Sequence, residues 1–256
     1  NDTLWLDCTS KGPFNYLGTF TQNREALVIK KDHSHFVKTP ALKPSDVVET
    51  KKMTVSQDDE GVARVNLQSV YRGDEFEDLK YLSRSYDETI QRQVIQNEFL
   101  PRSLELIESK MKFPHRDSAL VKLSCTAESN AIFRNYGPET IIKMISMDLP
   151  ELKDPKDRQL PVQIDYPIVK KDTLSYKIPV GYTLKKTYKN EEITSDMGLY
   201  RIVFERKENQ LVISKKFYLK RGKYSLRKYK ELYEFMAHIQ KIENKTYFVI
   251  RKDHSL

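Results

Sequence analysis

The stretch LVISKKFYLKRG, residues 211–222, decides the fold class of this chain. Its apolar residues Leu211, Ile213, Phe217 and Leu219 alternate with polar neighbours. A period of two residues is typical of a β-strand that buries one face and exposes the other. The stretch therefore predicts a strand lying over a hydrophobic core.

Comparable extended runs lie on both sides of this stretch and are separated by turn-forming residues. In the run at 62–72, Ala63, Val65, Leu67, Ser69 and Tyr71 all fall on one face. The set indicates a mainly β protein with minor α, built as an antiparallel β-sandwich-type domain. The remaining predicted strands span residues 47–57, 104–113, 119–127, 139–147, 173–179, 198–206 and 246–252.

Two segments follow a helical period instead. Residues 76–100 predict one or two helices that end before Pro101. Residues 225–244 predict an amphipathic C-terminal helix, with Ser225 as its N-cap. Its apolar stripe consists of Leu226, Tyr229, Leu232, Tyr233, Met236, Ile239 and Ile242.

The first 45 residues have a different organisation from the rest. They predict a strand at 3–8 and a short hairpin formed by 25–30 and 35–39. Two prolines in residues 40–46 indicate a linker, so we expect one domain at 1–45 and a β-rich domain at 46–256. A second, weaker boundary is expected near 150–160.

Several function classes are disfavoured by composition. No apolar stretch is long enough to span a membrane, and no glycine-rich nucleotide motif is present. Two cysteines and five scattered histidines form no metal-binding pattern, so no metal or cofactor is expected. Net charge is +8, and residues 201–256 hold 15 Lys and Arg against 6 Asp and Glu.

Two parts of the chain resemble known bacterial families. LWLDCTS (4–10) and GPFNYLGTF (12–20) resemble the exit of a transglutaminase-like, papain-like thiol core, which closes on a WLD-x-T strand. Residues 158–182, 199–224 and 229–252 resemble the domain of unknown function that follows this core in many exported proteins. The resemblance implies that residues 1–45 are a remnant of a papain-like α+β core. It also implies an exported, periplasmic or cell-surface location.

The resemblance assigns Asp7 the third place in a Cys-His-Asp triad. In such a triad the carboxylate orients the imidazole that activates the thiol. The Cys and His would lie upstream, so this chain is not expected to be active alone. Cys8 is not the expected nucleophile, because neighbouring strand residues point to opposite faces. A structural alternative is that Asp7 caps a turn with Thr9 and Ser10.

Three functional hypotheses follow. The first is a non-catalytic accessory or binding module that packs on the upstream core or holds a cell-envelope protein or peptide. The second is a fragment of an active thiol enzyme that hydrolyses amides or transfers acyl groups. The third is a basic polyanion-binding module, although nucleic acid is not the favoured partner. Its candidate residues are Lys215, Lys216, Lys220, Arg221, Lys223 and Arg227.

Overall fold

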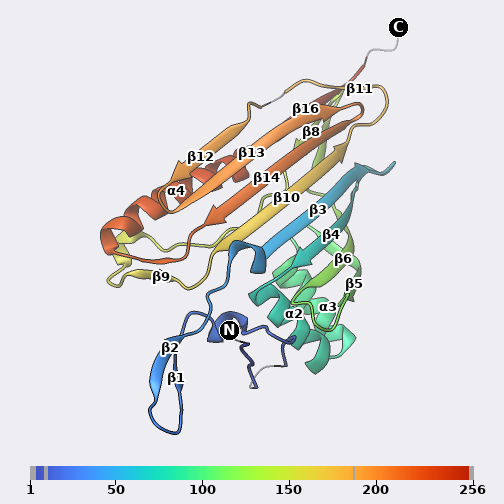
Figure 1. Cartoon of the computed structure of the whole chain (residues 1–256). Coiled ribbons are helices and arrows are strands. Elements are labelled where there is room, and N and C mark those ends of the chain that lie inside the picture. The colour runs from blue at the N-terminus through green and yellow to red at the C-terminus, as the bar shows by residue number, and fades with distance from the viewer. Residues whose placement is uncertain (1–3, 9–10, 187, 254–256) are drawn as a thin grey trace.

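The computed structural model describes residues 4–8, 11–186 and 188–253. Its centre is one eight-stranded sheet with the order β12-β13-β14-β10-β3-β4-β6-β5 (Figure 1). The strands are β3 (Val48–Gln57), β4 (Ala63–Tyr71), β5 (Glu105–Lys112), β6 (Val121–Ser129), β10 (Ile168–Lys177), β12 (Glu191–Ser195), β13 (Gly198–Lys207) and β14 (Gln210–Leu219). The mainly β class predicted from the sequence is confirmed.

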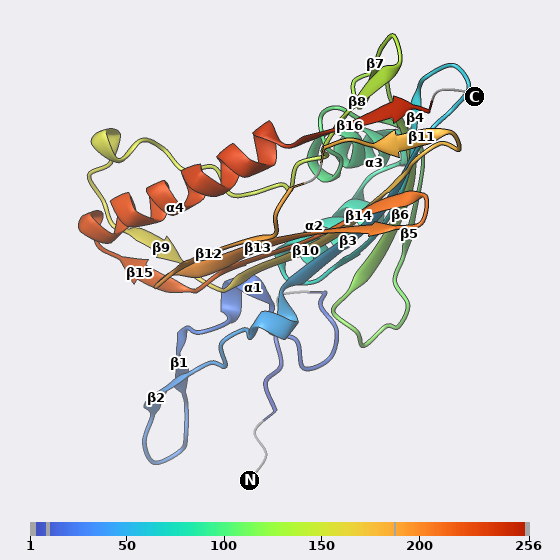
Figure 2. The same cartoon turned by 90° about the horizontal axis from the view of Figure 1, so that it is seen from above.

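One face of this sheet is covered by helices and by a second sheet (Figure 2). The helices are α2 (Asp74–Ser85), α3 (Glu88–Val94) with a π-helical turn at Ile95–Phe99, and α4 (Leu226–Lys245). The second sheet has the order β11-β16-β8-β7, with β11 at Tyr182–Leu184, β16 at Tyr247–Lys252, β8 at Glu139–Lys143 and β7 at Phe133–Tyr136. Two short strands, β9 (Val162–Ile164) and β15 (Gly222–Tyr224), pair beside the start of α4, and a 3₁₀ turn lies at Pro155–Asp157.

The hydrophobic core lies between these layers and follows the alternation in the sequence. All five residues expected on one face of β4 are buried, which confirms that prediction. Large aromatic side chains fill the same layer, including Tyr176, Phe217 and Phe248. Burial of apolar surface is the main favourable term in folding, so this layer supplies most of the stability.

The sheet contains one parallel pair, β10 with β3, where only antiparallel pairing was predicted. This pair joins two four-stranded halves that are formed by separate parts of the chain. Strand β10 also begins five residues before the predicted run at 173–179. The early part was missed because Lys170 and Asp172 occupy buried positions and interrupt the apolar pattern.

The N-terminal segment lies on the other side of the large sheet (Figure 2). It contains α1 (Gly18–Thr21), the hairpin β1 (Glu25–Val28) and β2 (His35–Lys38), and a 3₁₀ turn at Pro44–Asp46. The hairpin confirms its prediction. Residues 4–8 form no strand, so the strand predicted at 3–8 is wrong over these described residues.

Helix α4 begins at the predicted N-cap, where the Ser225 hydroxyl accepts a hydrogen bond from the Lys228 amide at 3.4 Å. Its buried face differs from the predicted stripe in the first turn, in the middle and near the end of the helix. Leu226 is 45% exposed, whereas Phe235 and Glu243 are buried. A buried glutamate on a helix that packs on a sheet requires partners, and these define the first candidate site.

Candidate functional sites

A row of charged side chains lies inside the core, across the middle of the large sheet. Asp172 on β10 is paired in register with Lys51 on β3 and with Lys215 on β14. All three are buried, so they face the helices rather than water. Removing a charge from water is costly unless it is paired. We call these residues, with Glu49, Lys170 and Glu243, the buried ionic cluster.

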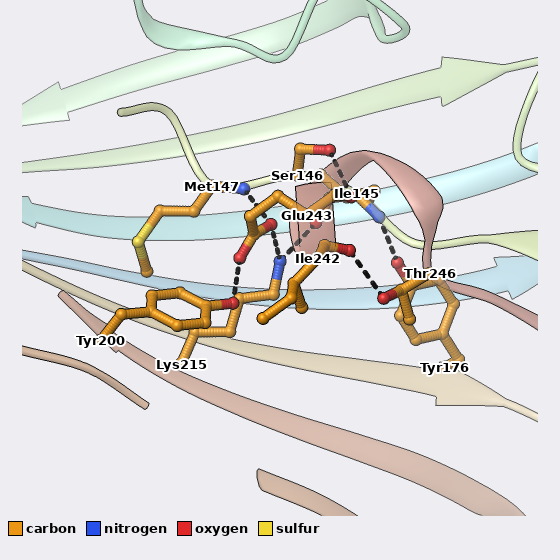
Figure 3. Close-up of polar contacts among 9 residues, drawn as sticks. All are labelled: Ile145, Ser146, Met147, Tyr176, Tyr200, Lys215, Ile242, Glu243 and Thr246. Atoms are coloured by element: carbon orange, nitrogen blue, oxygen red, sulfur yellow. Dashed lines mark hydrogen bonds and ion pairs between the residues drawn. The ribbon is translucent and has the colours of Figure 1, made fainter. Parts of the chain in front are cut away.

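Lys215 and Glu243 form the best-enclosed pair of the cluster. The Lys215 ammonium lies 2.6 Å from Glu243 Oε2 and donates to the Ile145 carbonyl at 2.8 Å. The same carboxylate accepts from the Met147 amide at 2.8 Å and from the Tyr200 hydroxyl. Figure 3 shows these groups converging on Glu243. Four segments, α4, β13, β14 and the 145–147 connection, are therefore joined by one carboxylate.

Glu49 joins the two halves of the sheet. Its two oxygens lie 2.6 Å from the Lys51 ammonium and 2.8 Å from that of Lys170. Lys170 also lies 3.3 Å from Asp148. Burial opposes ionisation of Glu49, but the two ammonium groups outweigh it and lower its pKa. The parallel pair of strands is therefore supported by side-chain charges as well as by backbone hydrogen bonds.

Asp172 is the least satisfied member of the cluster. Burial raises its pKa to about 6, although the nearby Lys51 and Lys215 favour the charged form. Its Oδ1 atom accepts no hydrogen bond from the described residues. Asp172, Lys51 and Glu243 contribute to the wall of a cavity of about 750 Å³ between the sheet and the 144–149 connection.

The buried ionic cluster was not predicted from the sequence. The available signal was charge at the apolar positions of an alternating strand, as with Lys215 between Ile213 and Phe217. The cluster needs residues from β3, β10, β14 and α4, and the pairing of distant strands is not readable from local alternation.

Asp7, the predicted triad carboxylate, lies in the N-terminal segment. Its Oδ2 accepts a hydrogen bond from the Thr21 hydroxyl at 3.1 Å. It also lines a hollow of about 600 Å³ to which His115 contributes, whereas the exposed Cys8 is not among the lining residues. The turn-capping partners Thr9 and Ser10 lie outside the described residues. The triad role of Asp7 stays a prediction.

The six predicted polyanion-binding residues do not share one surface. Lys215 is inside the core, and Lys216 faces the opposite side of the sheet. Lys220 is exposed after β14 and donates to the Asp196 carbonyl at 2.7 Å. The other three, Arg221, Lys223 and Arg227, are exposed around β15 and the start of α4.

The N-terminal segment is fastened to the body of the protein through Glu77 on α2. The Glu77 carboxylate accepts from the Tyr16 hydroxyl at 2.6 Å and from the Thr19 amide and hydroxyl, both at 2.8 Å. The Tyr16 ring also packs edge-on against Phe76 at 5.9 Å between centroids. We call these contacts the Glu77 anchor. They hold residues 16–19, whereas the hairpin beyond them projects from the body (Figure 2).

The described residues contain no group of three or more His, Cys, Asp or Glu side chains arranged to hold a metal ion. No helix in this part of the chain is both long and apolar enough to cross a membrane.

Residues 141–249 match a family described as "Domain of Unknown Function with solved-structure structure (DUF3858)". The match begins in β8 and ends in β16, so it covers α4 and the β10 half of the large sheet. Comparison with curated proteins gives no match. This part of the chain is therefore similar to a family without a known activity.

Proposed function

We propose that this chain is a non-catalytic accessory module of a transglutaminase-like protein and packs on the upstream core through residues 4–8 and 11–39. One observation carries the proposal: the N-terminal segment exposes a concentration of large apolar side chains. The seven are Leu4, Leu6, Phe14, Phe20, Leu27, Ile29 and Phe36, each more than half exposed. Apolar surface concentrated in this way is typical of a contact site.

The hairpin β1–β2 is the clearest part of this surface. Ile29 is 81% exposed and Phe36 is 72% exposed, and among the described strands β1 pairs with β2 alone. A two-stranded hairpin is marginally stable in water unless it packs on something. The hairpin therefore has the properties of an element completed by a neighbouring domain.

The occupant we propose is the transglutaminase-like core of the same polypeptide. The segment that exposes the apolar side chains is the one whose sequence resembles the end of such a core. Domains of the matched family also occur together with transglutaminase-like domains. The Glu77 anchor would hold the end of that core against the β-rich domain. An exported, periplasmic or cell-surface location is part of this proposal.

In this proposal any thiol chemistry belongs to the upstream core, and Asp7 supplies only the third triad carboxylate. The alternative is that the chain is a fragment of an active thiol enzyme. Replacing Asp7 by Ala in the longer polypeptide tests whether the parent is an active thiol enzyme. An active parent loses amide hydrolysis or acyl transfer, whereas a parent without chemistry shows no activity to lose.

The first experiment is the intact mass and N-terminal sequence of the natural polypeptide from its own cells. The proposal expects several hundred further residues before Asn1, with a cysteine at a helix start and a histidine on a strand. A natural chain that begins at Asn1 would contradict it.

The second experiment compares two triple variants of the natural polypeptide. Phe20→Ser, Ile29→Ser and Phe36→Ser together should lower its melting temperature but leave that of the isolated chain unchanged. The matched control replaces Tyr136, Leu160 and Val180, which lie elsewhere and are also more than half exposed, by Ser. Equal effects of the two triples on the natural polypeptide would exclude the N-terminal segment as the contact.

A further inference from the structure

The outer face of the large sheet carries a row of basic side chains that strand register brings together. Arg201 on β13 pairs with Lys216 on β14, and Lys216 pairs with Lys171 on β10. Beyond Thr50 and Val70 the same row continues with Lys122 on β6 and Lys112 on β5. We call the five residues Arg201, Lys216, Lys171, Lys122 and Lys112 the basic row.

The basic row is open to solvent. All five side chains are exposed, and the covering helices and second sheet lie on the opposite face (Figure 2). Arg201 has a carboxylate neighbour, Glu192, at 3.8 Å. Within the described residues no Asp or Glu oxygen lies within 4.0 Å of the four lysines. Their charge is therefore available to a ligand.

The row is extended rather than clustered. It crosses seven neighbouring strands, which span about 29 Å at about 4.8 Å per strand. The next outward row adds two lysines. Lys52 on β3 lies beside the uncharged middle of the basic row, at Thr50 and Val70, and Lys110 lies beside Lys112 on β5. A linear anion lying across the strands meets positive charge towards both ends of the row and Lys52 beside its middle, whereas a small anion meets only one or two lysines.

The neighbouring side chains favour one kind of polyanion. The outward positions between and beside the lysines carry hydroxyl and amide groups from Thr50, Thr173, Ser214, Gln68 and Ser124. These groups suit the hydroxyls of a sugar chain. Neither row contains an aromatic residue, and stacking on aromatic rings is the usual basis of single-stranded nucleic-acid binding.

We propose that the outer sheet face binds an acidic polysaccharide, carboxylated or sulfated, across the basic row. This site lies on the same side of the sheet as the N-terminal segment, but its five residues lie outside residues 4–39. It also differs from the basic residues singled out in the sequence, of which only Lys216 belongs to the row.

The test measures heparin binding by this chain at increasing salt concentration. Lys171→Glu with Lys216→Glu should weaken binding by about tenfold or more and flatten its salt dependence, because fewer counterions are released. Lys112→Glu with Lys122→Glu, at the far end of the row, should act in the same direction. Lys223→Glu with Arg227→Glu changes the net charge by the same amount outside the row and should have less than about a third of that effect.

Three results would overturn the proposal. They are equal weakening by the row variants and the charge-matched control, no binding of heparin by the parent chain, and stronger binding of polyuridylate RNA or polyglutamate than of heparin. Unchanged melting temperatures of the variants show that the comparison concerns folded protein. The replaced side chains are exposed, so folding is expected to be retained.

Discussion

At the scale of single residues, Lys215 shows how a charge can be kept inside a core. Its side chain is fully buried, and its ammonium is satisfied by Glu243 and the Ile145 carbonyl. Such pairs contribute little net stability compared with apolar residues, because desolvation offsets the attraction. Removing one partner is different, since the other charge is then buried alone.

Lys215→Met is therefore expected to lower the free energy of unfolding by about 3–5 kcal/mol. Urea denaturation followed by circular dichroism measures the change. Lys216→Met, one residue along the strand but exposed, should change stability by less than about 0.5 kcal/mol. If the two variants were equally stable, Glu243 would have to be satisfied without Lys215.

Asp172 gives a prediction about pH. Its pKa is about 6 in the folded protein against 3.8 in the reference state, so the folded state holds the proton more tightly. The contribution of Asp172 to the free energy of unfolding is therefore fully present below about pH 4, where the carboxyl is protonated, and is lost as the pH rises through 6. The loss amounts to about 3 kcal/mol by neutral pH.

Asp172→Asn should remove that loss. Its stability relative to the parent chain should rise by about 3 kcal/mol between pH 4 and pH 7.5 in urea titrations. The exposed Asp117→Asn, which removes one carboxylate outside the core, serves as the control for the change in net charge. A constant difference for Asp172→Asn would mean that its carboxyl does not titrate in this range.

At the scale of elements, strands and helices with a regular apolar period were predictable. The alternation in β4 and β14 and the N-cap of α4 all appear where the sequence places them. Departures occur where tertiary contacts decide the outcome. Leu226 follows the helical period, yet it is exposed at the first position of α4, three residues before the first buried residue, Tyr229. Glu243 breaks the period because its partners lie on other elements.

The Glu77 anchor yields a prediction about the N-terminal segment. Glu77→Ala removes the acceptor of three hydrogen bonds from Tyr16 and Thr19, each worth about 1.5–3 kcal/mol when one group is charged. We expect limited proteolysis within residues 11–39 to accelerate about tenfold or more, while the main unfolding transition of the sheet shifts little. Mass spectrometry of the fragments locates the cleavage.

The control for this variant is Asp78→Ala, which removes an exposed carboxylate from the next position of α2. It should leave the cleavage rate unchanged. Equal acceleration by both variants would attribute the effect to α2 itself rather than to the anchor.

At the scale of the whole molecule, the large sheet is built from two parts of the chain. Residues 48–129 form one half and residues 168–219 form the other, and the halves meet only at the parallel pair β10–β3 within this sheet. The family match covers the second half together with α4. Neither this division nor the buried ionic cluster could be predicted, because both depend on pairing between strands about 120 residues apart.

A fragment of residues 138–256 is therefore expected not to fold alone. It lacks Glu49 and Lys51, which neutralise Lys170 and Asp172, and it exposes the inner edge of β10. Size-exclusion chromatography should show aggregated or unfolded fragment, and co-expression with residues 1–137 should restore a compact complex. A monomeric fragment with a cooperative melting transition would show that the matched family is an autonomous unit.

The parallel pair has a consequence for synthesis on the ribosome. Strand β3 is made about 120 residues before β10, and at 5–20 residues per second it waits for several seconds with one edge unpaired. An apolar edge in that position would recruit other nascent chains. Glu49 and Lys51 on β3 point towards the core. Their buried charges disfavour pairing of β3 with any strand that carries no opposite charge to neutralise them. The charges that join the finished sheet therefore have a second effect while the chain is incomplete. They favour pairing of β3 with β10, which carries the matching charges, and disfavour pairing of β3 with strands of other chains.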